Sequence, residues 1–142
     1  KHKYIGIGER LDTIQAAILL AKLPNFKKEL KDRQRVADLY TNRLERTSSI
    51  KQYRTSAWAQ YTLRVKNREI FQLKLKDDGI PTSVFYPIPL HLQECFKYLN
   101  YKNNNFPVSE KASKEVISLP MNPYLTDDQV EYIILNIKNN IL

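Results

Sequence analysis

The chain is poor in cysteine. Cys95 is the only one among 142 residues, so no disulfide can form within the chain, and the paired cysteines of a structural zinc site are missing. The first residues also lack the charged-then-apolar pattern of a secretory leader. We therefore expect a cytoplasmic protein whose fold depends on an apolar core.

Histidine is equally scarce, and the common catalytic signatures are absent. His2 and His91 lie far apart, and neither has an acidic residue at metal-ligand spacing beside it, so we expect no metal. The sequence contains neither a glycine-rich phosphate loop nor a G-x-S-x-G turn. Cys95 follows His91 by four residues without a third, orienting group. This pattern is more typical of a buried thiol near a surface histidine than of a nucleophile and its base.

No apolar run is long enough to cross a membrane, and no block of like charge stands out. The longest apolar stretch, Ile14–Leu23, contains Gln15 and Lys22 and is about half the length that a bilayer requires. The formal net charge is +8, yet the basic residues of segment 27–35 are interspersed with acidic ones. Such mixing is typical of a solvated helix face, so we expect neither a membrane nor a nucleic acid as partner.

Size and composition indicate one globular domain. Of the 142 residues, 42% are hydrophobic and 27% are charged, as in ordinary globular proteins. A chain of this length buries a real core if its helices and strands are amphipathic. The pattern of apolar residues therefore decides the fold class.

The first third of the chain predicts helices. Residues 1–10, which we call the lead-in, predict an extended or mobile segment, and apolar residues at helical spacing begin at Leu11. Pro24 cannot donate a hydrogen bond to the residue four positions back, so it predicts a kink or a restart. Beyond it, residues 25–44 predict a long amphipathic helix.

The middle of the chain predicts a small sheet. Alternating side chains favour strands over residues 50–54, 57–65 and 82–86, and the short link between the first two favours an antiparallel hairpin. Between the second and third strands, Asn67 is positioned to cap a helix that Gly79 would end.

The last third predicts two further helices. One is expected from Ser109 to Ile117, and another follows Thr126, which has capping-box spacing with Gln129. The buried stripe of this last helix is expected at Val130, Ile133, Ile134 and Ile137. These elements predict an α/β chain of the α+β kind, with a three-stranded, mainly antiparallel sheet packed against several helices and a long helix near the N-terminus.

Two segments are shaped for something other than packing. In the first, Gly6 and Gly8 permit close backbone approach, and Arg10 offers a bidentate donor to a carboxylate or phosphate. A flexible entry with a solvated arginine explains the same residues equally well. The sequence alone leaves both interpretations open.

The second segment is Thr82–Leu92, in which two prolines follow a strand pattern. Pro87 and Pro89 hold the chain extended between Tyr86 and His91. This arrangement presents aromatic and imidazole side chains on a rigid edge that loses little entropy on binding. A stiff connection between core and loop is the alternative, and spacing alone favours it.

Six blocks follow one another along the sequence: IGIGERLDTIQAAILLAKL, RQRVADLYTNRL, AQYTLRV, GIPTSVFYPIPLHLQ, FPVSEKA and SLPMNPYLTDDQV. In this order they resemble the carboxy-terminal part of the DegT/DnrJ/StrS sugar aminotransferases, over essentially the whole chain. The resemblance implies a fold-type-I architecture, pyridoxal phosphate as cofactor, and transfer of an amino group from glutamate to a keto-sugar linked to UDP or dTDP. It also implies a homodimer.

The same resemblance divides the chain into two parts. It implies that residues 1–24 are the lead-in and connecting helix toward an absent large domain, and that residues 25–142 are the small carboxy-terminal domain. In the family the large domain carries the lysine that forms the Schiff base, which has no counterpart here. We therefore expect the chain alone to hold no catalytic residue, to be inactive and not to bind the cofactor. The alternative is a stand-alone binding module that keeps the small-domain fold.

The resemblance also implies roles for five residues. Gly8 stands where the family has an asparagine that helps to hold the cofactor phosphate, so only its N–H remains for that role. Arg10 matches an arginine that faces the substrate. Phe85 and Tyr86 stand where the family often has histidine-tyrosine beside the nucleotide-sugar, and His91 keeps its place after the second proline. The QYT and YPIPLHLQ blocks most resemble enzymes that act on UDP-linked 3-keto-sugars for surface polysaccharides.

Overall fold

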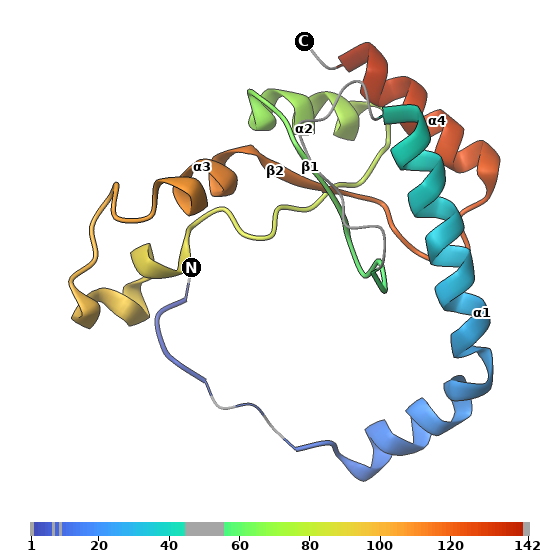
Figure 1. Ribbon diagram of the computed structural model, residues 1–142, viewed down its shortest axis with the longest axis horizontal. Helices are drawn as coiled ribbons and strands as arrows, with labels where there is room; N and C mark the ends of the chain where they lie inside the picture. The colour runs from blue at the N-terminus through green and yellow to red at the C-terminus, as the bar shows by residue number, and fades with distance from the viewer. Residues whose placement is uncertain (1, 7, 9, 45–55, 141–142) are drawn as a thin grey trace.

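The computed structural model describes residues 2–6, 8, 10–44 and 56–140. Its elements, in chain order, are α1 (Thr13–Leu44), β1 (Tyr61–Arg64), α2 (Arg68–Asp77), the short 3₁₀ helices η1 (Leu90–Leu92) and η2 (Glu94–Leu99), α3 (Pro107–Glu115), β2 (Val116–Leu119) and α4 (Asp127–Asn140). Figure 1 shows α1, α2 and α4 around one part of the two strands, with α3, η1 and η2 on the other side. Among the described residues, no helix is both long and apolar enough to cross a membrane.

The long helix α1 begins at a side-chain cap. The Asp12 carboxylate accepts a hydrogen bond from the Ile14 N–H at 2.8 Å, and the Asp12 N–H donates to the Gln15 side chain at 3.2 Å. The two bonds satisfy N–H groups that lack partners within the helix. The predicted restart at Pro24 is wrong, because the helix continues through this residue to Leu44. Figure 1 shows the ribbon bending between its blue first turns and its cyan last turns, as the predicted kink requires.

The sheet has two strands instead of the predicted three. β1 pairs with β2 in antiparallel register, with Tyr61 opposite Leu119 and Leu63 opposite Ile117. The expected third strand, residues 82–86, contributes a single antiparallel bridge, in which Ser83 and Ser118 exchange hydrogen bonds of 3.1 and 2.7 Å. Prolines on both sides of this segment remove the backbone donors that a longer ladder needs. The antiparallel character is confirmed, and the third strand is reduced to that bridge.

Two of the predicted strand and helix boundaries also change. The strand expected from residue 57 begins only at Tyr61, since Trp58 has a positive φ of 47° that interrupts extended backbone. Its expected hairpin partner, residues 50–54, lies outside the described residues. The helix expected to reach Ile117 ends at Glu115, and β2 follows directly. Val116 and Ile117 are β-branched, and Ile117 is completely buried against the rest of the core.

The ends of α2 illustrate a prediction that is half right. Asn67 occupies the residue before the helix but adopts a left-handed conformation, and its side chain makes no capping bond. Gly79 ends the helix as predicted, at a φ of 73°. The Gly79 N–H donates to the Lys76 carbonyl at 3.0 Å, and the Ile80 N–H donates to the Leu75 carbonyl at 2.8 Å. These two bonds form a Schellman motif, which favours glycine at the left-handed position.

The last helix and the core follow the sequence pattern closely. Thr126 and Gln129 exchange the two bonds of a capping box, at 3.0 and 3.2 Å, which confirms that prediction. α4 packs against α1 and α2, and its predicted stripe is buried. The core side chains come from both strands, from α2 and α4 and from the second half of α1, and the largest that are fully buried are Tyr40, Tyr61, Leu44, Leu63, Leu75, Ile117, Ile137, Val36 and Val130.

The first half of α1 carries apolar side chains that no described residue covers. Ile14 is 73% exposed, and Ile18 and Leu19 are each 56% exposed. Burial on this helix begins only at residue 36. Figure 1 shows these first turns extending away from the remaining elements. The helix therefore has a packed half and an uncovered apolar half.

Candidate binding site

The segment that follows the Ser83 bridge presents two aromatic side chains to solvent. Phe85 is 43% and Tyr86 is 63% exposed, and their ring centroids lie 5.8 Å apart in an edge-on arrangement. The peptide bond between them is cis. Pro87 and Pro89 follow, and η1 begins directly after the second proline. The two rings therefore project from a segment in which proline fixes much of the backbone.

A cavity of about 410 Å³ opens beside these rings. One of its sides is the aromatic and proline segment, which we call the wall and define as residues 85–90. The other sides come from His2, Gln93 and the face of α3 that carries Ser109, Ala112 and Ser113. The lining is mostly apolar, with a few amide and hydroxyl groups, as is usual for sites that bind small molecules.

The Gln93 side chain connects two segments that line the cavity, a role that the sequence analysis did not predict. Gln93 is only 4% exposed. Its Oε1 accepts a hydrogen bond of 3.0 Å from the His2 N–H, and its Nε2 donates one of 3.1 Å to the Ile88 carbonyl. The first of these bonds spans 91 residues of sequence. No local periodicity signals such a contact, because Gln93 lies between two short 3₁₀ helices.

His91 lies in η1, directly after the wall in the chain, and does not line the cavity. Its side chain is 8% exposed, and its Nε2 lies 3.1 Å from the Glu110 carboxylate. The ring packs on Phe106 at a centroid distance of 4.8 Å. Since an ionised carboxylate only accepts hydrogen bonds, Nε2 carries the proton in this pair. The structure thus supplies the orienting partner that sequence spacing around His91 did not reveal.

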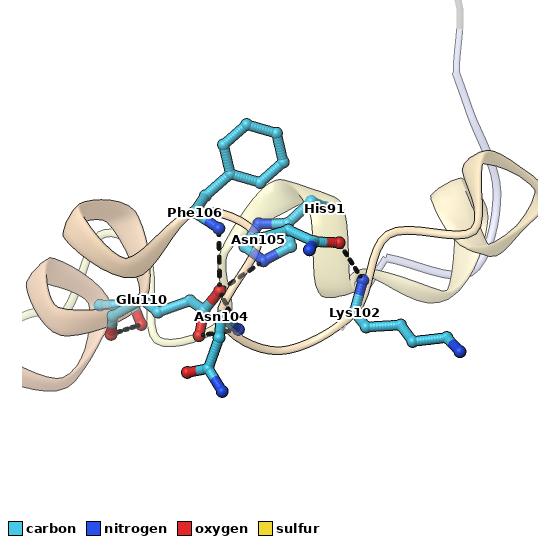
Figure 2. A network of polar contacts seen from close by, with 7 residues as sticks. His91, Lys102, Asn104, Asn105, Phe106 and Glu110 are labelled. Atoms are coloured by element: carbon cyan, nitrogen blue, oxygen red, sulfur yellow. Dashed lines mark hydrogen bonds and ion pairs between the residues drawn. The ribbon is translucent and has the colours of Figure 1, made fainter.

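Glu110 is the centre of a polar network (Figure 2). Its carboxylate accepts hydrogen bonds from the N–H of Asn104 at 2.9 Å and from the N–H of Phe106 at 3.2 Å, in addition to the bond from His91. The bond from the Asn104 N–H contributes most to lowering the pKa of Glu110 below its usual range, and the Phe106 N–H and His91 lower it further. The network therefore joins η1, the loop before α3 and the first turn of α3 through one carboxylate.

The lead-in reaches the site at one point only among its described residues. The His2 carbonyl accepts a hydrogen bond of 3.3 Å from the Cys95 N–H, and its ring lies edge-on to Tyr86 at 6.4 Å. Gly8 and Arg10 are exposed, and neither belongs to the cavity lining. A side-chain carbon placed on Gly8 would meet no atom within 4 Å. The structure thus brings Phe85 and Tyr86 to the cavity, whereas His91, Gly8 and Arg10 do not line it.

The described residues hold no metal centre. No group of three or more histidine, cysteine, aspartate or glutamate side chains in this part of the chain is arranged to bind a metal ion. The cavity lining also contains no lysine and no acidic side chain. The lining of this cavity therefore does not by itself fit pyridoxal phosphate, which needs a lysine for its Schiff base.

Two curated proteins are similar to nearly the whole of this chain. It is 43% identical to a UDP-2-acetamido-2-deoxy-3-oxo-D-glucuronate aminotransferase of Pseudomonas aeruginosa, over 97% of this chain and 39% of that protein. It is 41% identical to a pleiotropic regulatory protein of Geobacillus stearothermophilus, over 94% of this chain and 38% of that protein. The chain therefore spans about two fifths of the length of these relatives.

Solved structures give the same result. A DegT DnrJ EryC1 StrS aminotransferase from Brucella abortus matches 95% of this chain with 37% of its own, at 39% identity and a TM-score of 0.83. DesV of S. venezuelae, in complex with a ketimine intermediate, matches 98% of this chain with 39% of its own, at 26% identity and a TM-score of 0.84. These neighbours have the fold-type-I architecture, which confirms the predicted fold class.

A family model describes nearly the whole chain. The model of the DegT/DnrJ/EryC1/StrS aminotransferase family matches residues 1–138. This match confirms the family that the six sequence blocks predicted. The family depends on pyridoxal phosphate. The chain belongs to the DegT/DnrJ/EryC1/StrS aminotransferase family.

Proposed function

We propose that this chain is the carboxy-terminal part of an aminotransferase that moves an amino group from glutamate to a keto-sugar linked to UDP or dTDP. The observation that carries the proposal is the family match over residues 1–138, combined with relatives of which the chain spans only about 38%. One relative is named for a UDP-linked 3-oxo sugar, and another, from Aneurinibacillus thermoaerophilus, is named for a dTDP-linked amino sugar. A role in making surface polysaccharides, in the cytoplasm, fits these substrates.

The cofactor would be held mainly by the part of the protein outside this chain. When bound, pyridoxal phosphate supplies the amino-group chemistry. The contribution of this chain is a wall for the nucleotide-sugar. Phe85 and Tyr86 are exposed aromatic side chains that can stack on a pyrimidine base or a sugar face, and the Tyr86 hydroxyl can form a hydrogen bond. Arg10 can pair with a phosphate, and Gly8 can offer only its N–H to the cofactor phosphate.

The role of His91 is proposed to be indirect. With 8% of its side chain exposed and its Nε2 bonded to Glu110, His91 has little surface left for a substrate. It packs on Phe106 and lies in η1, immediately after the wall. We propose that His91 stabilises the position of the wall without contacting the substrate, while Phe85 and Tyr86 contact the nucleotide-sugar.

The uncovered half of α1 is consistent with a two-part protein. Residues 1–24 would connect to a large domain and residues 25–142 would form the small domain. The exposed apolar side chains of the first half of α1 would then pack on the large domain and on the second subunit of a homodimer. This packing would remove from water the apolar surface that the described residues leave open.

The test uses the protein that the complete reading frame encodes. Purified with pyridoxal phosphate, it should change the absorbance of its cofactor when glutamate is added, whereas the 142-residue chain alone should show no such change. A reading frame without any large domain, or a full-length protein that does not respond to glutamate, would contradict the proposal. The first of these outcomes would favour a stand-alone binding module with the small-domain fold.

A further inference from the structure

Gln93 joins two segments that are far apart in sequence and adjacent at the cavity. One is the lead-in, through the His2 N–H, and the other is the wall, through the Ile88 carbonyl. The neighbouring Cys95 N–H donates to the His2 carbonyl at 3.3 Å, so both backbone groups of His2 are held by residues 93–95. We call this set of three hydrogen bonds the Gln93 contact.

The side-chain amide of Gln93 has only one orientation that satisfies its partners. The His2 N–H can only donate, so it requires the Oε1 of the amide, and the Ile88 carbonyl can only accept, so it requires the Nε2. The backbone of Gln93 is also fixed, because its N–H donates to the Leu90 carbonyl at 3.0 Å. Gln93 is only 4% exposed, so the loss of either side-chain bond leaves a buried polar group without a partner.

Both ends of the Gln93 contact lie next to candidate substrate residues. Ile88 lies between Pro87 and Pro89, two residues after Tyr86 in the chain. The His2 ring lies edge-on to the same Tyr86, at a centroid distance of 6.4 Å. The lead-in continues from His2 toward Arg10. One glutamine therefore fixes the position of the lead-in relative to the wall.

We propose that Gln93 is a positioning residue that couples the lead-in to the wall of the nucleotide-sugar site. The proposal rests on the function proposed above, and it adds a residue that never touches the reacting atoms. A site that is ordered before the ligand arrives loses less conformational entropy on binding. Without the Gln93 contact, the lead-in and Tyr86 would have to be ordered by the nucleotide itself, and the affinity for nucleotide would fall.

The contact is tested directly by amide hydrogen exchange on the full-length protein. Gln93→Met keeps the length of the side chain and removes both side-chain bonds, so the amides of His2 and Cys95 should exchange at least about tenfold faster. Gln93→Glu keeps the acceptor for the His2 N–H and loses the donor for the Ile88 carbonyl, so it should give an intermediate rate. The matched control is Asn139→Met, which removes the side-chain amide of an exposed residue on α4 and should leave these rates unchanged. Unchanged exchange in Gln93→Met would overturn the proposal.

The coupling to the site is tested by titration with UDP and with dTDP. The Kd of the nucleotide that binds should rise about tenfold in Gln93→Met and less in Gln93→Glu, and it should stay at the wild-type value in Asn139→Met. Faster exchange with an unchanged Kd would overturn the coupling. If the wild-type protein bound neither nucleotide, the proposed function would fail, and the exchange rates would still decide whether the Gln93 contact exists.

Discussion

Glu110 shows how a single carboxylate can hold several segments of a site. Its hydrogen bonds with His91 and with the N–H groups of Asn104 and Phe106 connect three stretches of chain (Figure 2), and none of these residues lines the cavity. The lowered pKa of Glu110 means that the folded state favours the ionised form. The stability that the ionised form contributes is therefore complete above the ordinary glutamate pKa and is lost as the pH falls through the lowered value.

The variant Glu110→Gln tests this pH dependence. We expect the free energy of unfolding, measured with urea, to be lower than that of the wild type at pH 7, and the difference to shrink as the pH falls below about 4. Glu131→Gln removes a partner of Arg43 in a mostly exposed ion pair and should have little effect at either pH. A difference between Glu110→Gln and wild type that stayed constant down to pH 3 would show that the ionised carboxylate is not what stabilises the network.

Tyr40 makes a different kind of contact, inside the core. It is fully buried in the core, and its hydroxyl donates to the Pro120 carbonyl at 3.0 Å. Tyr40→Phe should lower the free energy of unfolding by about 1 kcal/mol, because the part-buried hydrogen bond to the Pro120 carbonyl is lost. Tyr132→Phe is the matched control, since its hydroxyl donates to the Asp78 carbonyl at an exposed position where water can replace it. Equal effects of the two variants would argue against burial as the cause.

At the scale of an element, the end of α2 depends on one glycine. Gly79 has a φ of 73°, which a side chain disfavours even though open space surrounds the position. Gly79→Ala should therefore lower the free energy of unfolding by about 1 kcal/mol. Gly6→Ala, at a glycine without a positive φ and with equally open surroundings, should change it little. Thermal unfolding of the two variants side by side measures the difference. A Gly79→Ala protein as stable as the wild type would mean that the turn can adopt another geometry.

The elements differ in how far the sequence could predict them. The capping box and the buried stripe of α4 depend on residues within a few positions of one another, and both are confirmed. The first two residues of β2, Val116 and Ile117, were predicted as the end of a helix, because their identity as a strand depends on pairing with β1, more than 50 residues earlier. The same dependence on distant partners limits what the sequence can predict of the candidate site. Phe85 and Tyr86 stand out in a local motif, whereas Gln93 binds the His2 N–H 91 residues away and Glu110 binds His91 19 residues away, contacts that no local pattern reveals.

At the scale of the whole molecule, the exposed half of α1 should make the isolated chain associate. Apolar side chains such as Ile18 and Leu19 are more than half exposed, and such surfaces tend to bind another surface. Analytical ultracentrifugation of the 142-residue chain should show association that increases with concentration. Replacing Ile18 and Leu19 with Glu should abolish it with little change in unfolding free energy, because neither side chain contributes to the packed core. A wild-type chain that stayed monomeric at every concentration would contradict this prediction.

Transfer of labelled nitrogen tests whether the full-length protein is a nucleotide-sugar aminotransferase. The full-length protein, loaded with pyridoxal phosphate, is mixed with nitrogen-15 glutamate and a UDP-linked 3-keto-sugar, and in a parallel reaction with a dTDP-linked one. We predict that mass spectrometry finds the label in the nucleotide-sugar product of one of these reactions, and that boiled protein gives none. A folded, cofactor-loaded protein that transfers no label to either nucleotide-sugar would contradict the proposed function.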